Sequence, residues 1–344
     1  MMAAEGIAHV DVDIARRLLG GVRLRLSPVC GGRNSRVYRV DSSGDGIFAL
    51  KRYLPLENDG RDRLGVETSA LRWMASHGLD MVPRVMAVDV ETGSVLLSWM
   101  GGSRPNELRP GDVDQVIEFL RVLERLRRTA PLRGARLASE ACLSGKELER
   151  QIRKRLSDLA ALDDEPALRT FLREEFIGVF EIFLDRARRV LLSSELSFEA
   201  ELRPENQSLV PSDFGFHNAL RDDLGRLAFV DFEYFGWDDP AKLTSDTLLH
   251  PGTQMNCKLR SRFRSAVQAL YGNDPKFSAR WYALYPLFAL RWALILLNEF
   301  HPERWKRRLL AGGTGSWSDA KRRQLCASRA MLEDCKGIFA WRLW

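Results

Sequence analysis

Apolar and polar side chains alternate along much of the first hundred residues, as they do in half-buried β-strands. The alternating or strongly apolar segments are residues 22–26, 37–40, 47–53, 84–90 and 94–100. Turn signals that contain glycine separate the early segments. Residues 61–75 instead repeat apolar positions at helical spacing, and residues 11–20 predict a short leading helix. The pattern therefore predicts a β-sheet with one main helix.

The rest of the chain is mainly helical in its periodicity. A clean apolar stripe runs through residues 113–126, and residues 145–193 continue at helical spacing with both signs of charge. Further helices are expected at residues 244–249, 258–271, 280–300 and 318–335. The stretch 281–300 is apolar enough to raise the question of a membrane span. Pro286 and Arg291 lie inside it, and a central Arg is costly in a bilayer, so a buried helix is expected and no membrane.

The stretch 209–240 interrupts the helices and carries the strongest candidate chemistry. Asp213 is followed five residues later by Asn218, which starts a short apolar strand at 218–220. A polar turn closed by glycine leads into a return strand at 226–230, which ends at Asp231. Such a hairpin brings Asn218 and Asp231 close together. An amide oxygen with nearby carboxylates suits Mg²⁺, a hard ion that takes oxygen ligands.

These residues resemble the catalytic core of kinases, and in particular the aminoglycoside phosphotransferase and choline kinase family. The resemblance lies in Asp-x-x-x-x-Asn, the hairpin, Asp-Phe-Glu at 231–233 and Gly-Trp-Asp-Asp-Pro at 236–240. It implies Asp213 as catalytic base or hydroxyl-orienting residue, and Asn218 and Asp231 as Mg²⁺ ligands. The family usually has His two residues before the catalytic Asp, where this chain has Pro211. The competing interpretation is an ordinary hairpin with surface acids.

The resemblance also implies a nucleotide site for ATP in the N-terminal region. Its expected residues are Gly31, Gly32 and Ser35 over the phosphates, Lys51 on the α and β phosphates, Glu67 paired with Lys51, and the hinge residues Ser98, Trp99 and Met100. Each has a plainer interpretation: a simple hairpin turn, a solvated strand Lys, an exposed helix acid. The implied fold is α+β and bilobal, protein-kinase-like. It has an antiparallel nucleotide-binding lobe at 1–100 and a larger helical lobe with a small catalytic hairpin at 101–344.

The amino-acid composition narrows the class of protein but does not point to a particular function. The 344 residues are 45% hydrophobic and 28% charged, which is ordinary for a soluble globular protein. The net charge of +6 arises mainly in the last ninety residues, and no nucleic-acid-binding motif accompanies it. The five cysteines are widely spaced without a Cys-x-x-Cys pair, which favours a reducing, cytoplasmic setting over disulfides or zinc. The N-terminus lacks the apolar core of a signal peptide.

The expected function is transfer of the γ-phosphate of ATP to a hydroxyl of a small molecule. The acceptor stays open, and the basic C-terminal region favours a neutral or anionic compound over a polycationic aminoglycoside. Candidates for the substrate site are Ser212, His217, Asp238, Arg291 and Glu299, and the favoured alternative for His217 is a packed loop residue. A nucleotide-binding pseudokinase or scaffold is the alternative, and a nucleic-acid-binding protein is a third possibility. The oligomeric state is not predicted.

Overall fold

The structure is a computed structural model, and it describes residues 9–29, 35–44, 46–54, 60–310 and 314–340. The chain forms two compact units, each described by itself below. The first unit contains Met1–Pro105, Asn218–Phe235 and Lys306–Thr314, and the second contains Asn106–His217, Gly236–Trp305 and Gly315–Trp344. The predicted division of the chain at residue 100 stays a prediction. The segment Asn218–Phe235, which contains the predicted hairpin, belongs to the first unit together with the N-terminal region.

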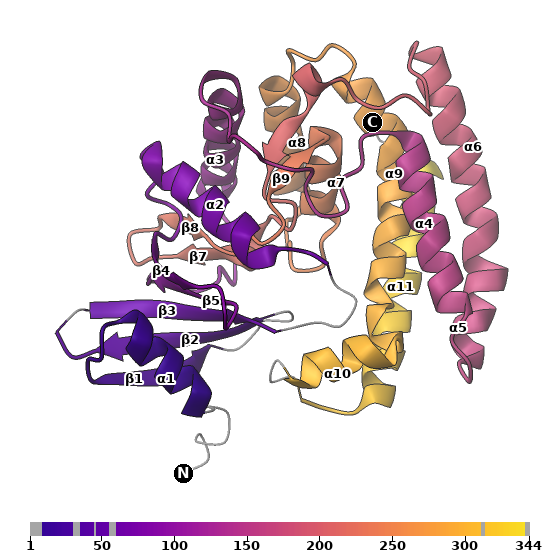
Figure 1. Cartoon of the computed structure of the whole chain (residues 1–344). Helices are drawn as coiled ribbons and strands as arrows, with labels where there is room; N and C mark the ends of the chain where they lie inside the picture. The colour runs from indigo at the N-terminus through magenta and orange to yellow at the C-terminus, as the bar shows by residue number, and fades with distance from the viewer. Residues whose placement is uncertain (1–8, 30–34, 45, 55–59, 311–313, 341–344) are drawn as a thin grey trace. The chain divides into compact units, whose positions relative to one another are not determined.

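An antiparallel sheet forms the centre of the first unit, in the order β1-β2-β3-β5-β4 (Figure 1). Its strands are β1 (Leu24–Val29), β2 (Ser35–Ser42), β3 (Gly46–Tyr53), β4 (Val85–Asp89) and β5 (Ser94–Ser98). The predicted strands are therefore all present, with shifted ends. Tyr38, Val40, Leu50 and Leu96 form one buried face of the sheet, against which Ile14 and Ala15 of α1 (His9–Leu18) pack. Period-two alternation thus produces one covered face.

The main helix of the first unit is α2 (Arg63–Ser76), close to the predicted 61–75. Asp62 caps it, because its side chain accepts a hydrogen bond from the Gly65 N–H at 2.8 Å. Helical spacing places the apolar residues Leu71 and Met74 on the buried side of α2, and Glu67 lies on the same side. Glu67 is the unexpected member of that set, since a buried carboxylate needs partners.

The hairpin predicted at 218–230 is present and consists of β7 (Ala219–Arg221) and β8 (Leu227–Phe229). Two backbone contacts attach it to the first unit. Arg221 exchanges hydrogen bonds with Ser103 at 3.1 and 2.8 Å, and the Phe229 N–H donates to the Met81 carbonyl at 2.7 Å. Gly102 permits the close approach, because a Cβ there would lie 2.5 Å from the Arg221 oxygen.

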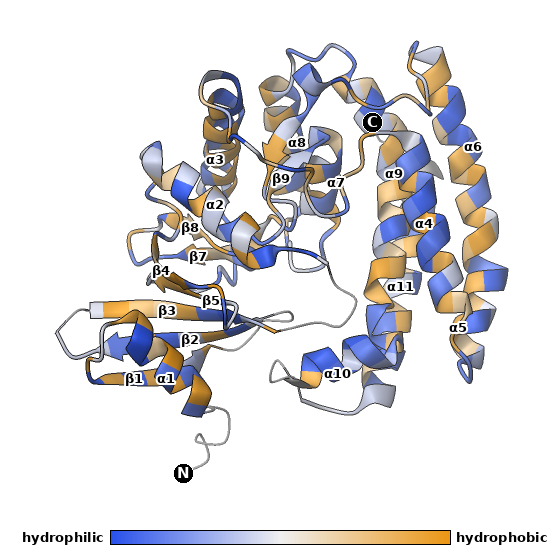
Figure 2. Cartoon of the chain, viewed as in Figure 1, coloured by the Kyte–Doolittle hydropathy of each residue, from blue (hydrophilic) through white to orange (hydrophobic). Residues whose placement is uncertain are grey.

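The second unit is mainly helical. Its helices are α3 (Pro110–Thr129), α4 (Gly145–Ala160), α5 (Pro166–Thr170), a π-helical stretch (Phe171–Phe176), α6 (Ile177–Ser193), α7 (Pro240–Leu249), α8 (Cys257–Leu270), α9 (Phe277–Leu296) and α11 (Trp317–Ala340). Hydrophobic and hydrophilic residues interleave along α4 and α6 (Figure 2), whose apolar sides join a core shared with α9 and α11. Helix α10 (Pro302–Leu310) was not predicted from the sequence. Its short, strongly basic sequence offers few apolar positions from which helical spacing can be recognised.

Helix α9 is a core helix, as expected from Pro286 and Arg291 within it. The stretch Phe277–Phe300 is long and apolar enough to cross a membrane, but 83% of its most apolar window is buried inside the protein. Arg291 is itself buried and its guanidinium donates to Gln151 Oε1 at 3.0 Å. These contacts fit a helix surrounded by protein rather than lipid.

Candidate active site

A buried lysine lies at the centre of the candidate nucleotide site. Lys51 is on β3, and its Nζ lies 2.8 Å from Glu67 Oε2 and 2.6 Å from Asp231 Oδ1. The structure therefore brings together three residues that the sequence assigned to one site from three separate segments. A solvated edge lysine is excluded, because the Lys51 side chain is only 7% exposed.

Charge keeps this lysine protonated. Burial acts to lower the pKa of Lys51, but the negative charges of Asp231, Glu67 and Glu233 outweigh it and raise the pKa above its ordinary value. For Glu67, burial raises the carboxyl pKa, and the charge of Lys51 offsets only part of that effect. The result is a fixed cation among carboxylates, as binding of phosphate groups and a metal ion requires.

Asp231 takes an uncommon backbone conformation at the end of the hairpin. Its φ is 72°, in the left-handed region that residues other than glycine rarely adopt. The adjoining residues are fixed on both sides: the Val230 N–H donates to the Asn218 carbonyl at 2.9 Å, and the Phe232 N–H donates to Glu67 Oε1 at 3.0 Å. Glu67 therefore bonds both Lys51 and the backbone beside Asp231. Backbone strain of this kind clusters at functional sites.

Three residues of this cluster were missed by sequence analysis. The Tyr53 hydroxyl donates to Glu67 Oε2, while Glu233 lies 3.6 Å from the Lys51 amine and 3.6 Å from the Arg63 guanidinium. The signals were present in part. Tyr53 follows Lys51 by two residues, so both side chains leave the strand on the same face. Glu233 is the third residue of the Asp-Phe-Glu motif, to which no role had been given.

The donor set fits a hard divalent cation. Lys51 contacts the carboxylates of Glu67, Asp231 and Glu233, and Arg63 contacts that of Glu233. With all five side chains ionised, this set carries one net negative charge. The Asp231 side chain is 35% exposed and so reaches water. Asn218, whose backbone pairs with Val230, lies beside it at the base of the hairpin. Carboxylate and amide oxygens at this place fit Mg²⁺, and the roles of Asn218 and Asp231 stay predictions.

The described residues among the remaining nucleotide-site predictions lie at or just beyond the ends of strands β2 and β5. Gly31 and Gly32 lie outside the described residues. Ser35 begins β2 and is buried. Ser98 ends β5, and its N–H donates to the Arg84 carbonyl at 2.9 Å, so the chain leaves the sheet at Trp99 and Met100, as a hinge would. Trp99 lies under the Arg39 guanidinium, 5.4 Å from the ring centroid. Their contact with adenine stays a prediction.

Asp213, the predicted base, belongs to the second unit and lies on the loop after β6 (Ser208–Val210). His217 Nε2 lies 3.0 Å from Asp213 Oδ1, and because a carboxylate only accepts, the imidazole donates. The His217 ring stacks on His250 with centroids 3.6 Å apart. The three side chains have ligand atoms within 4.8 Å of one another.

This group fits hydrogen bonding better than metal binding. The Nδ1 of His250 accepts from the Gly252 N–H at 3.0 Å, so the neutral ring carries its proton on Nε2 and has no lone pair there for a metal. His217 donates through Nε2 toward Asp213. Asp213 therefore has a neighbour that orients its carboxylate. His217 packs within the loop, which is the interpretation that the sequence favoured for it.

Two of the candidate substrate-site residues have structural roles instead. Asp238 and Arg291 are 0% and 4% exposed, and they bond to other buried polar side chains. Asp238 lies on β9 (Gly236–Asp238), which pairs with β6 in a two-stranded sheet. Gly236 makes that pairing possible beside the 136–138 segment, because a Cβ there would lie 2.5 Å from the Ala138 nitrogen.

Comparison with known proteins agrees with this geometry. A model of the phosphotransferase enzyme family matches residues 25–242, which is more than half of the chain. The chain belongs to this family. No curated protein sequence matches it.

Solved structures with the same fold cover nearly the whole chain. A choline kinase from Cryptosporidium parvum is similar with a TM-score of 0.57 at 10% identity, over 97% of this chain and 98% of that one. A spectinomycin phosphotransferase in complex with ADP and spectinomycin gives 0.62 at 10% identity, over 94% and 98%. A macrolide 2′-phosphotransferase from Brachybacterium faecium gives 0.54 at 17% identity, over 90% and 100%. The protein-kinase-like α+β fold is thereby confirmed.

Proposed function

We propose that this phosphotransferase-family chain moves the γ-phosphoryl group of ATP to a hydroxyl of a small molecule. The observation that carries the proposal is the Lys51–Glu67–Asp231 cluster. In it, the amine of a buried lysine lies 2.8 Å from a buried helix carboxylate and 2.6 Å from the carboxylate of a strained hairpin aspartate. An ordinary hairpin with surface acids gives no reason to bury that lysine. Membership of the phosphotransferase family agrees with it.

Each residue has a task that its environment supports. Lys51 binds the phosphate oxygens of the nucleotide, and Glu67 and Tyr53 orient it. Asn218 and Asp231 would bind Mg²⁺, which neutralises charge on the phosphate oxygens when bound. Glu233 and Arg63 complete the charge balance behind Lys51. Little covalent chemistry is required, because alignment and charge stabilisation supply most of the rate.

Asp213 acts at the acceptor. The acceptor oxygen attacks the γ-phosphorus, the bond from that phosphorus to the β–γ bridging oxygen breaks, and the hydroxyl proton passes to the Asp213 carboxylate. His217 donates to Oδ1 of that carboxylate and orients it. A neutral or anionic hydroxyl compound is the proposed acceptor class, on the basis of the basic C-terminal composition.

The test is ATP consumption with Mg²⁺ across aminoglycosides, choline, ethanolamine, simple sugars and nucleosides. Wild type is compared with Asp231→Ala and with Asp223→Ala, a matched control because Asp223 is an exposed acid of the same hairpin. A compound that stimulates the wild type and the control, but not Asp231→Ala, supports the proposal and identifies the acceptor class. Nucleotide binding without any turnover would favour a scaffold, and absence of nucleotide binding would contradict the site itself.

A further inference from the structure

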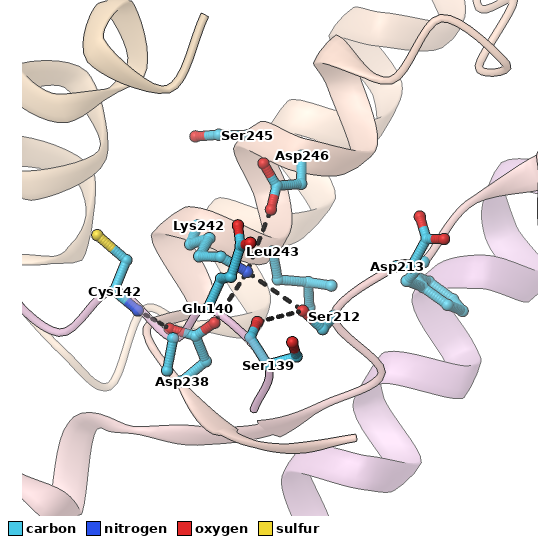
Figure 3. A network of polar contacts seen from close by, with 12 residues as sticks. Ser139, Glu140, Cys142, Ser212, Asp213, Asp238, Lys242, Leu243, Ser245 and Asp246 are labelled. Atoms are coloured by element: carbon cyan, nitrogen blue, oxygen red, sulfur yellow. Dashed lines mark hydrogen bonds and ion pairs between the residues drawn. The ribbon is translucent and has the colours of Figure 1, made fainter. Parts of the chain in front are cut away.

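A buried lysine on α7 contacts the loop that carries Asp213 (Figure 3). Lys242 Nζ lies 3.0 Å from Asp238 Oδ2 and 3.2 Å from Asp246 Oδ2, and it donates to Ser212 Oγ at 3.3 Å. Lys242 is 1% exposed. Burial acts to lower its pKa, but the charges of Asp238 and Asp246 outweigh burial and raise it, so the lysine stays charged.

The partners of Lys242 are themselves fixed. Asp238 Oδ1 accepts from the Cys142 N–H at 2.7 Å and from the Asp239 N–H at 2.8 Å. On the other side, Asp246 Oδ1 accepts from the Trp292 indole N–H at 2.7 Å. Because these hydrogen bonds fix both carboxylates, they also fix the position of the Lys242 ammonium group between them. One of its three N–H donors then points at the Ser212 hydroxyl. Lys242 is therefore a rigid donor to the loop.

Ser212 needs such a partner. Its φ is 67°, in the left-handed region, and its hydroxyl donates to the Ser139 carbonyl at 3.2 Å while it accepts from Lys242. On the far side of Asp213, the Thr247 hydroxyl of α7 lies 3.4 Å from the Phe214 carbonyl. Helix α7 thus contacts the residue before Asp213 and the residue after it.

We infer that Lys242 is a positioning residue for Asp213, acting through the Ser212 hydroxyl in place of the family histidine that Pro211 replaces. This inference rests on the proposed function in assigning catalysis to Asp213, but the contact itself does not. Proline at 211 has neither a side-chain donor nor a backbone N–H with which to fix the loop. The Lys242–Ser212 contact supplies a donor one residue further along, from a helix that is buried along most of its length.

The first test removes the hydroxyl alone. Ser212→Ala keeps the same left-handed strain and leaves Lys242 with both carboxylates. The matched control is Ser245→Ala on the same helix, where the buried hydroxyl donates to the Ala241 carbonyl at 2.7 Å and has no contact with the loop among those described. We expect Ser212→Ala to lower kcat about 10²-fold with KM for ATP unchanged, and Ser245→Ala to leave kcat at the wild-type value.

A second readout does not need activity. Hydrogen exchange of the segment 211–216, followed by mass spectrometry, should accelerate in Ser212→Ala and not in Ser245→Ala. If the wild type transfers no phosphate, the proposed function fails while exchange still decides whether the contact orders the loop. Unchanged exchange in Ser212→Ala, with transfer intact, would overturn the inference alone.

A double-variant cycle tests whether Lys242 acts through Ser212. Lys242→Gln with Asp246→Asn removes one positive and one negative charge together, so the buried site stays balanced. If both changes act through one contact, adding Ser212→Ala to this pair should change exchange and kcat no further. Independent, additive effects would overturn the inference.

Discussion

Replacing Lys51 with Met should measure how much the Lys51–Glu67–Asp231 cluster contributes to the free energy of unfolding. The change keeps most of the side-chain length but leaves Glu67, Asp231 and Glu233 without their common cation. Glu67 and Glu233 are 1% and 4% exposed, so they cannot regain water, whereas Asp231 is partly solvated. Removing one partner of a buried ion pair costs about 3–5 kcal/mol. Because Arg63 remains 3.6 Å from Glu233, we expect the lower end, about 3 kcal/mol.

The loss should depend on pH with a defined sign. Burial already raises the pKa of Glu67 above its value in an unfolded chain, and loss of Lys51 raises it further. The ionised carboxylate therefore destabilises the fold at pH 8, and protonation relieves that cost as the pH falls through the folded-state pKa. Between pH 8 and pH 5 the deficit should shrink by about 1–2 kcal/mol, since one pKa unit corresponds to about 1.4 kcal/mol.

Urea unfolding followed by circular dichroism at both pH values measures these differences. Lys258→Met is the matched control, because Lys258 is an exposed helix residue whose replacement should change the free energy of unfolding by less than about 0.5 kcal/mol. A Lys51→Met deficit equal at pH 5 and pH 8 would refute the argument that buried carboxylates cause it. No deficit at either pH would refute the buried cluster.

Three further predictions concern the loop, the hairpin and the metal. Asp213→Asn should lower phosphoryl transfer about 10²–10⁴-fold without loss of nucleotide binding, and Asp223→Asn should not; steady-state kinetics with nucleotide titration decides. Gly102→Ala should lower the free energy of unfolding by about 1–3 kcal/mol, because the φ of Gly102 is 103° and a Cβ there would lie 2.5 Å from a carbonyl oxygen of β7. Gly101→Ala is the control, since a Cβ at that position would meet open space, and thermal unfolding compares the two variants. Chelation of Mg²⁺ should stop ATP turnover, and Asn218→Ala should raise the Mg²⁺ concentration that restores half of it, as a metal titration of the rate would show.

The nucleotide cluster could be predicted because its signals are local in sequence. The alternating pattern predicted the strand that carries Lys51, helical spacing predicted the helix that carries Glu67, and the turn at 222–225 predicted the hairpin that ends at Asp231. Each of these needs only a few neighbouring residues. That Lys51 and Glu67 lie inside came from the resemblance, because a strand Lys and a helix acid are ordinarily solvated. The motif then related the three segments to one another.

The support of the Asp213 loop could not be predicted in the same way. Lys242 on a helix is ordinarily solvated, and only tertiary packing buries it between Asp238 and Asp246. The stacking of His217 on His250 joins residues far apart in the chain, without a periodic pattern that would indicate it. Asp238 and Arg291 were candidate substrate-site residues in sequence. In the structure they belong to one buried chain of ion pairs, in which Asp238 contacts Lys242, Lys242 contacts Asp246, and Asp246 contacts Arg291.

The central claim is tested most directly by following labelled phosphate from the γ-position of ATP to an acceptor. Wild type and Asp213→Asn, both shown to bind nucleotide, are incubated with Mg²⁺ and the compound that most stimulates turnover. The account predicts a labelled phosphate monoester from the wild type and almost none from the variant. Equal labelling by both proteins would contradict the role of Asp213. Nucleotide binding by a wild type that labels no compound would contradict phosphoryl transfer as the function.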